Sequence, residues 1–348
     1  MDRPRRRALL AAMLAGLLAP TQAPAQPAAP STPTPATPAS TQPGPSVAPA
    51  AFPTRTVRII VPFPAGGTAD VLPRIVAEKL SARWGQSVII ENRPGAGGNL
   101  GAEAVARAEP DGHTLLASPP GPLAINQSLY AKLPYDATRF VPISILATVP
   151  NVLAVRAALP AGSLSELIAQ ARANPGKLTY ASQGNGSTSH LTASMLQAMG
   201  GVQMVHVPYK GTAPALTDLI GGQIDLFFDN LSSSLGHARS GKLRILAVAG
   251  PRRNALLPDV PTMAEAGLPG FQSVTWFGVA APPGTPDAVA RQVAAAIDEA
   301  LKAPDVQRRF AEQAAEPVGG TPAETAAFIR DEAARWKRVI ATAKVTLD

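Results

Sequence analysis

The chain of 348 residues contains no cysteine, few aromatic residues and few charges. The absence of cysteine excludes disulfides, thiolate nucleophiles and cysteine-bound metals. The four histidines, at positions 113, 190, 206 and 237, lack the spacing typical of a metal site, so we expect neither a metal nor another cofactor. Charged residues make up only 16% of the chain and form no basic stripe, which argues against a nucleic-acid partner.

Long hydrophobic runs are also absent, because none reaches the roughly 18 residues that a membrane span requires. The run Ala8–Ala19 is shorter, follows the basic segment Arg3–Arg7 and precedes the small residues Ala23-Pro24-Ala25. This order predicts a signal peptide over residues 1–25, with the exported chain beginning near Gln26. An uncleaved amphipathic helix is the alternative interpretation, and the adjacent Arg6 and Arg7 leave both the Sec and the twin-arginine route open.

Residues 26–53 consist mainly of proline, alanine, threonine, serine and glutamine. This composition cannot form a packed core, so we expect a disordered or polyproline-like tether. No cysteine follows the signal peptide, which argues against a lipid anchor.

Short apolar strands alternate with helical stretches along the rest of the chain, which predicts an α/β fold. The pattern runs from residue 57 to residue 117 and restarts after Pro150. The expected strands are 57–61, 87–90, 114–117, 152–155, 177–181, 202–207, 224–228, 243–249 and 274–280. The expected helices are 69–84, 99–107, 164–173, 187–199, 213–220, 286–302, 305–313 and 322–343.

The restart predicts two lobes, each a mainly parallel sheet flanked by helices. Because the C-terminal helices have no sheet of their own, the chain must return to the first lobe. We expect the first lobe to comprise 54–150 and 275–348, and the second 151–274. Two crossings form a hinge, and the groove between the lobes is then the expected ligand site. One continuous doubly wound sheet is the alternative.

The loop Pro62–Asp70 joins a buried strand to the start of a helix. Its glycines let the backbone approach a ligand, and the free N–H groups of the helix favour an anion. Asp70 would repel an anion on the helix axis, so we expect the ligand beside the loop, in part through water. The candidate ligand-binding residues of this loop are Phe63, Ala65, Gly66, Gly67 and Thr68. A tight turn that binds nothing is the alternative.

A second loop of this kind, Ser182–His190, belongs to the second lobe. It offers glycines, hydroxyls and amides around free N–H groups, and with the first loop it could clamp a small acid. Its candidate ligand-binding residues are Ser182, Gly184, Gly186, Ser187, Thr188, Ser189 and His190. A Ser187–His190 hydrolase is the enzymatic alternative, disfavoured because the Gly-x-Ser-x-Gly motif is absent. No catalytic residue is therefore predicted.

Asp229 follows another buried strand of the second lobe. At the end of a strand in a cleft, its carboxylate could bind a ligand amine or hydroxyl. It could equally cap the helix that begins near Leu231. Asp229 is therefore a further candidate for ligand binding, with the helix cap as the alternative.

Several segments in order resemble the substrate-binding proteins of tripartite tricarboxylate transporters, the TctC or Bug receptor family. The resemblance runs from about Phe52 to the C-terminus. It rests on the two loops described above and on further segments, namely Glu91–Gly98, Pro110–Leu115, His206–Gly211, Pro258–Thr262 and Glu265–Pro269. His113 departs from the family pattern, in which tyrosine is usual.

The resemblance implies a periplasmic, two-lobe receptor of the flytrap type that is not an enzyme. It implies that the loops at Phe63–Thr68 and Ser182–His190 hold a carboxylate, partly through bridging waters. Ligands in similar proteins include dicarboxylates, tricarboxylates, amino acids and aromatic acids. The implied partners are the large and small membrane subunits of a transporter, and we expect a monomer. An orphan sensor of the same ligands is the alternative function.

Overall fold

The computed structural model describes residues 22, 23, 25 and 52–347. The predicted signal peptide and tether therefore lie, apart from a few residues, outside the described residues. Phe52 and Pro53, which the prediction placed in the tether, belong to the folded part. The ring centroid of Phe52 lies 5.7 Å from that of Trp84 and 5.0 Å from that of His113.

The first lobe is built on a sheet with the strand order β2-β1-β3-β9-β4-β10. Its parallel part comprises β1 (Val57–Val61), β2 (Val88–Asn92) and β3 (Thr114–Ser118). Strands β9 (Val274–Ala281) and β10 (Glu316–Gly319) complete it with the first part of β4. The lobe also contains the helices α1 (Thr68–Trp84), α2 (Asn99–Ala106), α8 (Asp287–Lys302), α9 (Pro304–Glu312) and α10 (Pro322–Ala343).

The second lobe is built on a sheet with the order β6-β5-β7-β4, and β8 pairs with the other edge of β4. Its strands are β5 (Thr179–Ser182), β6 (Val205–Pro208), β7 (Leu226–Asn230), β8 (Leu243–Val248) and the last part of β4. Its helices are α4 (Leu164–Ala173), α5 (Thr188–Gly200), α6 (Thr212–Ile220) and α7 (Leu231–Arg239).

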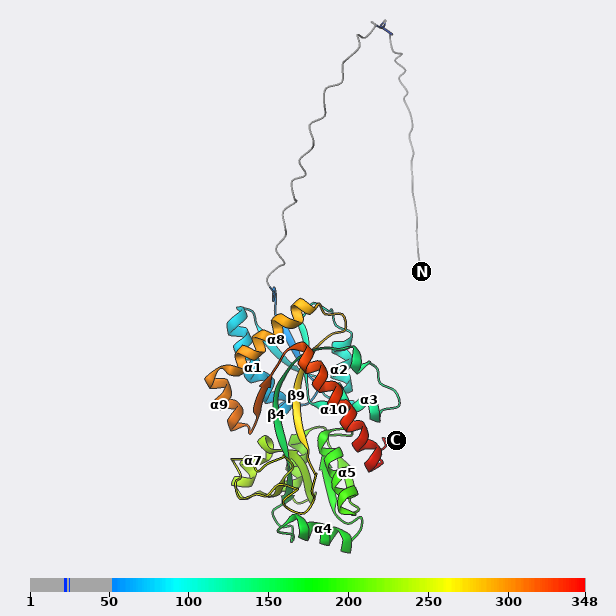
Figure 1. Cartoon of the computed structure of the whole chain (residues 1–348), viewed down its shortest axis with the longest axis vertical. Helices are drawn as coiled ribbons and strands as arrows, with labels where there is room; N and C mark the ends of the chain where they lie inside the picture. The colour runs from blue at the N-terminus through cyan, green and yellow to red at the C-terminus, as the bar shows by residue number, and fades with distance from the viewer. Residues whose placement is uncertain (1–21, 24, 26–51, 348) are drawn as a thin grey trace, which may run out of the picture. The chain divides into compact units, whose positions relative to one another are not determined.

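Strand β4 (Val141–Arg156) belongs to both sheets and runs with β9 along the middle of the folded part (Figure 1). Up to Pro150 it pairs with β9, and from Asn151 it pairs with β7. The sequence predicted only 152–155 of this strand, whereas the strand in the structure also contains Pro142 and Pro150. Both prolines are tolerated where pairing is irregular, Pro142 at a register shift and Pro150 at the change of partner.

The α/β class with two lobes is confirmed, but the sheets are mixed rather than mainly parallel. Strand β9 is antiparallel to both β3 and β4, and β4 is antiparallel to β7 and β8. Strands β4 and β9 run antiparallel because β4 carries the chain out of the first lobe and β9 carries it back. The lobe limits 54–150 with 275–348, and 151–274, stay a prediction, although the change of partner falls between Pro150 and Asn151.

Several short elements were not predicted from the sequence. They are β10, η1 (Ala96–Gly98), η2 (Gly121–Ile125), α3 (Asn126–Leu129) and η3 (Ala137–Arg139). Each is too short to show a period. Helix α10, by contrast, has the limits that the sequence predicted, because a capping box formed by Thr321 and Glu324 fixes its start.

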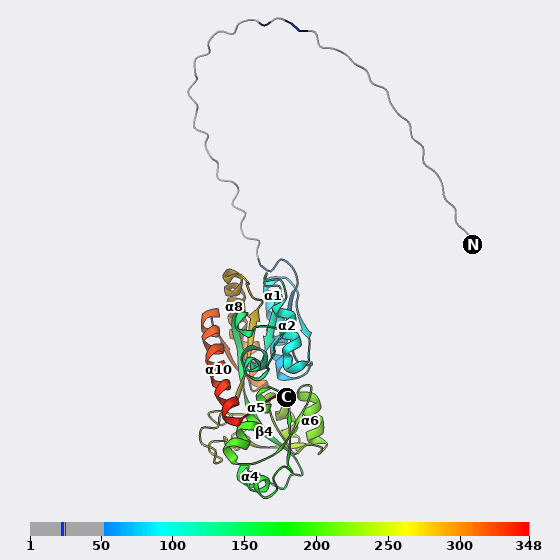
Figure 2. The ribbon, with the colours of Figure 1, turned by 90° about the vertical axis from the view of Figure 1, so that its right-hand side faces the viewer.

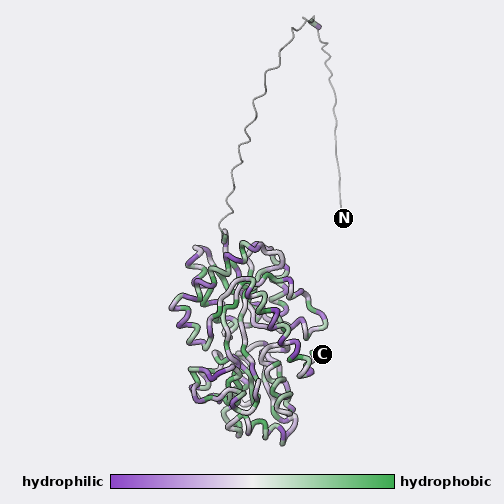
Figure 3. Tube along the Cα trace, in the orientation of Figure 1, coloured by the Kyte–Doolittle hydropathy of each residue, from purple (hydrophilic) through white to green (hydrophobic). Residues whose placement is uncertain are grey.

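Apolar side chains cover both faces of each sheet. One cluster packs β1 and β4 against α1 and α8, and another fills the opposite face with Trp276 and Ile60. The second lobe has two smaller clusters, around Phe228 and Phe227. Hydrophobic and hydrophilic stretches alternate along the outer helices, as their amphipathic sequences require (Figure 3).

Helix α10 links the two lobes in addition to the two crossing strands, and both ribbon views show it running from the first lobe toward α5 (Figures 1 and 2). Its buried Trp336 and Ile340 pack in one cluster with Leu191 of α5. The Arg335 guanidinium donates to the Gln272 carbonyl, just before β9, at 2.7 Å. The sequence did not predict this third link.

Candidate functional site

The first predicted loop lies between β1 and α1. Gly66 has a φ of +90°, and its N–H donates to Asp70 Oδ2 at 3.0 Å. Burial alone would raise the pKa of Asp70, but hydrogen bonds from Arg74, the Gly66 amide and Asn92 outweigh it and hold this pKa below its usual value. Because Asp70 is engaged by these partners, its negative charge is largely compensated within the first lobe.

The second predicted loop lies between β5 and α5. Ser187 is the N-cap of α5, and its hydroxyl also donates to the Gly184 carbonyl at 2.6 Å. Gln183 is held at both ends, because its backbone N–H donates to Ser189 Oγ and its side-chain Nε2 donates to Thr212 Oγ1. The loop is therefore ordered by its own side chains and by the neighbouring start of α6.

A third loop, between β6 and α6, meets the first loop across the groove. A Cβ atom at Gly67 would lie 3.5 Å from Thr212 Oγ1, and one at Gly211 would lie 3.0 Å from Pro64. Thr68 Oγ1 forms hydrogen bonds with the hydroxyls of Ser232 and Ser233 at the start of α7. The first lobe therefore touches the second through hydroxyl and glycine contacts.

These contacts enclose a cavity of about 20 Å³, which has room for about one water molecule. A ligand of four or more carbons can enter only if the lobes separate. No charged side chain is among the described residues that line it. They are Phe63, Pro64, Gly67, Thr68, Ala69, Pro119, Gln183, Gly211, Thr212, Asn230 and Phe277.

Three of the predicted site residues, Phe63, Gly67 and Thr68, line this cavity. Ala65 and Gly66 lie in the same loop but do not line it. Of the second loop, the cavity is lined by Gln183, which was not among the predicted contacts. Ser182, Gly184, Gly186, Ser187, Thr188, Ser189 and His190 lie beside or behind it, and all of these stay predicted ligand contacts.

The predicted contact Asp229 is completely buried behind the cavity. Its Oδ1 accepts from Gln183 Nε2 at 3.0 Å and its Oδ2 from Ser234 Oγ at 2.8 Å. Burial raises the pKa of Asp229 to about 7. The alternative of a helix cap is wrong, because the N-cap of α7 is the next residue, Asn230.

His190 points away from the cavity. Its ring stacks on that of His206, with ring centroids 4.1 Å apart, and His206 stacks on Tyr180 at 4.8 Å. Burial lowers the pKa of His190 to about 3, with a further contribution from the His206 charge, and burial lowers the pKa of His206 to about 4. Both rings are therefore neutral at pH 7.

The residues that sequence reasoning missed fall into two kinds. Gly211 and Thr212 follow a strand and begin a helix, the same signal that identified the first two loops, so they could have been found. Pro119 directly follows β3 and Phe277 lies in β9, and neither carries a local signal of ligand binding. They reach the cavity because their strands are neighbours in the first sheet.

The geometry does not support a hydrolase at Ser187. Its hydroxyl donates to a carbonyl, and His190 Nδ1 accepts from the Gly186 N–H at 3.3 Å. Another serine, Ser182, lies 2.7 Å from His206 Nε2 but is completely buried. Neither serine combines a base with access to a substrate.

A wider hollow of about 770 Å³ lies between α8 and the start of α10. It is a poor site for an acid because it is lined by the carboxylates of Asp287, Asp298 and Glu324 and by a single guanidinium, that of Arg291. The small cavity between the lobes is therefore the better candidate, although it is much smaller in this closed arrangement.

Within residues 52–347, no group of three or more potential ligand side chains could hold a metal ion. No helix in that part of the chain is both long enough and apolar enough to cross a bilayer.

Comparisons with known proteins agree on one family. The model of the tripartite tricarboxylate transporter family receptor matches residues 72–345. Protein BugT of Bordetella pertussis is 42% identical over 291 residues, which cover 83% of this chain and 89% of that protein. The UPF0065 protein in the tcbD–tcbE intergenic region of Pseudomonas sp. strain P51 is 41% identical over 292 residues, or 83% of this chain and 87% of that protein.

Solved structures give the same result. R. palustris Rpa4515 with adipate has a TM-score of 0.82 and 40% identity, covering 85% of this chain and 99% of that chain. MatC from Rhodopseudomonas palustris with bound malate has a TM-score of 0.80 and 36% identity, covering 83% and 100%. The periplasmic binding protein BugD has a TM-score of 0.81 and 36% identity, covering 85% and 99%.

Proposed function

This chain belongs to the tripartite tricarboxylate transporter receptor family, and from that premise we propose that it captures a small carboxylate between its two lobes. The observation that carries the proposal is the cavity where three loops meet, each at the start of a helix. Hydroxyls, amides and backbone N–H groups line it, without a charged side chain among the described residues.

The start of α1 supplies the binding energy for an anion. The first N–H groups of a helix have no partner within it, and the helix dipole places partial positive charge there. Gly67 precedes α1 and Thr68 begins it, and both face the cavity. A carboxylate bound here needs no lysine or arginine.

Closing the lobes strengthens this binding. Thr68 belongs to the first lobe, whereas Thr212 and Asn230 belong to the second, so a ligand has all its partners only when both lobes reach it. Closure also expels water, which strengthens each charge-assisted hydrogen bond. A ligand that binds the closed form more tightly shifts the population toward it.

The ligand class follows from the relatives, which include structures with adipate and with malate. We infer that this chain binds a dicarboxylate, a tricarboxylate, an amino acid or an aromatic acid. Its proposed role is to deliver that acid, in the periplasm, to the large and small membrane subunits of a transporter. Export with cleavage near Ala25, and the absence of turnover, are parts of the same proposal.

Calorimetry of the chain from Gln26 onward against such acids tests the function. Replacing Thr68 by valine should weaken the bound acid roughly 2- to 10-fold, because one hydroxyl is lost from the cavity. The control is Thr217→Val, since Thr217 is exposed on α6. No binding of any acid in the panel, or ester hydrolysis that Ser187→Ala abolishes, would contradict the proposal.

A further inference from the structure

Two side-chain amides line the cavity from the second lobe, Gln183 and Asn230. The NH₂ group of each amide donates hydrogen bonds to other side chains of the protein. Gln183 Nε2 lies 3.0 Å from both Asp229 Oδ1 and Thr212 Oγ1. Asn230 Nδ2 donates to Asn151 Oδ1 at 3.0 Å.

The orientation of the Gln183 amide is set by Asp229. An ionised carboxylate can only accept hydrogen bonds, so the opposite orientation would place the Gln183 carbonyl oxygen against the Asp229 oxygen. Thr212 does not fix the orientation of the amide, because its hydroxyl can either donate or accept a hydrogen bond. With its NH₂ group turned toward Asp229, Gln183 leaves its Oε1 without a hydrogen-bond partner among the described residues.

The cavity therefore has two chemically different sides. The start of α1 and Thr68 offer donors, which suit a carboxylate. Gln183 Oε1 offers only an acceptor, and Asn230 Oδ1 has one long contact, at 3.5 Å from Gln183 Nε2. A ligand group that meets these oxygens must donate a hydrogen bond, since a second carboxylate would be repelled there.

We propose that Asp229, acting through Gln183, makes this receptor select acids that carry a hydroxyl or ammonium group beside the bound carboxylate. The inference rests on the proposed function and adds the ligand's second recognition group. Asp229 is thus a positioning residue, since it is completely buried and reaches the cavity only through the Gln183 amide.

Matched ligand pairs that differ by one hydroxyl test the proposal, namely succinate with malate and phenylacetate with mandelate. Aspartate serves as the ammonium counterpart of malate. We expect the donor-bearing member of the pair that binds to have about tenfold higher affinity, the effect of one buried hydrogen bond. Gln183→Met, which removes the acceptor, should bring the ratio of the two affinities within about twofold, and this ratio rather than either affinity is the readout.

Asp229→Asn should lower the same ratio, because an asparagine amide can pair with Gln183 in either orientation. The matched control is Asp225→Asn, which alters the acid just before β7 that pairs with Arg156 and lies outside the cavity. This control should keep the wild-type ratio. If only Asp229→Asn fails to fold, the affinity ratio of Gln183→Met and the pH dependence of the wild-type ratio still test the proposal.

In the wild-type protein the ratio of the affinity for the donor-bearing acid to that for the plain acid should fall as the pH drops from 8.5 to 6. Burial raises the pKa of Asp229 to about 7, and the protonated carboxyl can donate to Gln183 Oε1 and release the amide. Asp229 lies opposite Val152 of β4 and accepts hydrogen bonds from Gln183, which follows β5, and from Ser234 of α7. None of these three side chains titrates. A ratio that does not depend on pH would contradict the role of Asp229.

The two proposals can fail separately. Equal affinity for both members of a pair in the wild-type protein would overturn this inference and leave the receptor function standing. If neither these acids nor any other acid of the panel described under Proposed function binds, both proposals fall.

Discussion

His190 and His206 make the folded protein sensitive to acid. The pKa of His190 is lowered to about 3 by burial and by the His206 charge, whereas in the unfolded chain it lies near 6.5. Below pH 6.5 His190 therefore binds a proton in the unfolded chain but stays neutral in the folded protein. The stability that neutral His190 contributes is present above pH 6.5 and is lost as the pH falls toward 3.

We expect His190→Gln to reduce the loss of stability between pH 7.5 and pH 5 by up to about 2 kcal/mol, since one proton over 1.5 pH units corresponds to that amount. Urea unfolding at both pH values measures it. Asp229 changes the stability in the opposite direction, because its raised pKa favours the folded state at low pH. This contribution is the same in the wild-type protein and in His190→Gln, so it cancels in the comparison. His237→Gln, in a half-buried residue of α7, is the control, and an equal loss in all three proteins would contradict the prediction.

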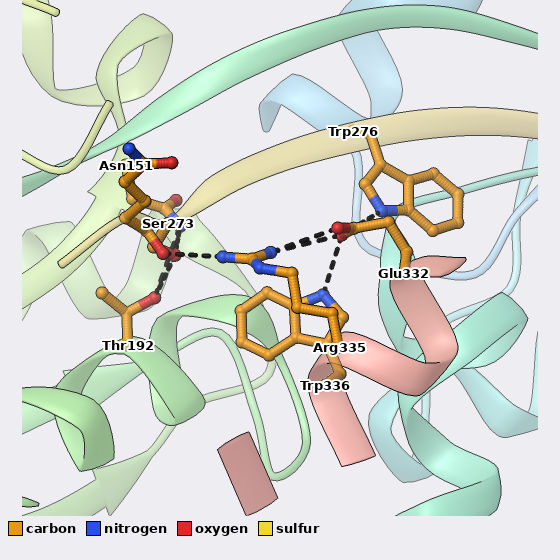
Figure 4. A network of polar contacts seen from close by, with 8 residues as sticks. Asn151, Thr192, Ser273, Trp276, Glu332, Arg335 and Trp336 are labelled. Carbon is orange, nitrogen blue, oxygen red and sulfur yellow. Dashed lines mark hydrogen bonds and ion pairs between the residues drawn. The ribbon is translucent and has the colours of Figure 1, made fainter. Parts of the chain in front are cut away.

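Helix α10 is tied to the crossing strand β9 by one carboxylate. Glu332 Oε2 accepts from the indole N–H of Trp276 on β9, at 3.0 Å, and from that of Trp336, at 3.1 Å. Figure 4 shows Glu332 between the two indoles, and Arg335 donates to the carbonyl of Gln272, the residue before Ser273. Ser273 Oγ accepts a hydrogen bond from Asn151 Nδ2 of β4 at 2.7 Å. The segment Gln272–Ser273 therefore contacts both α10 and β4.

Glu332→Ala should destabilise the folded protein by about 1–3 kcal/mol, because it leaves two buried indole N–H groups without an acceptor. Urea unfolding followed by tryptophan fluorescence is suited to the measurement, since Trp276 and Trp336 are themselves the reporters. Asp331→Ala removes the neighbouring carboxylate, whose side chain is 76% exposed, and should change stability by less than about 0.5 kcal/mol. Equal effects of the two substitutions would show that Glu332 does not hold α10 in place.

Opening and closing of the lobes should be blocked at Gly186. This glycine has a φ of +78°, and a Cβ atom there would lie 3.0 Å from Asn126 Oδ1 and 3.2 Å from Leu129 Cδ1, both of α3 in the first lobe. Valine at this position strains the loop and also pushes the lobes apart. Small-angle scattering should show the wild-type protein becoming more compact when it binds its acid, and Gly186→Val remaining extended.

Gly176→Val separates lobe contact from backbone strain. Gly176 has a similar φ, +69°, but no atom lies within 4 Å of its Cβ position. This variant should bind and become compact like the wild-type protein. If the wild-type protein binds an acid tightly without any change in radius of gyration, the ligand does not draw the two lobes together.

Local signals in the sequence were enough for most of the architecture. The helical pattern predicted the limits of α10, which the structure shows to begin at a Thr321–Glu324 capping box. The strand-loop-glycine-helix pattern located two of the three loops that meet at the cavity. The family resemblance, carried by these same loops, predicted a two-lobe receptor. Such signals can be read from the chain because caps, turns and periodicity involve residues a few positions apart.

The tertiary structure decided what those signals could not. It placed Asp229 behind Gln183, brought Phe277 of β9 to the cavity, and carried β4 unbroken through Pro150 from one sheet to the other. Each of these depends on contacts between residues 46 or more positions apart, as in the hydrogen bond from Gln183 to Asp229. The sequence shows that a loop can bind an anion, but only the packing of strands and helices determines which side chains face the ligand and which ones hold them there.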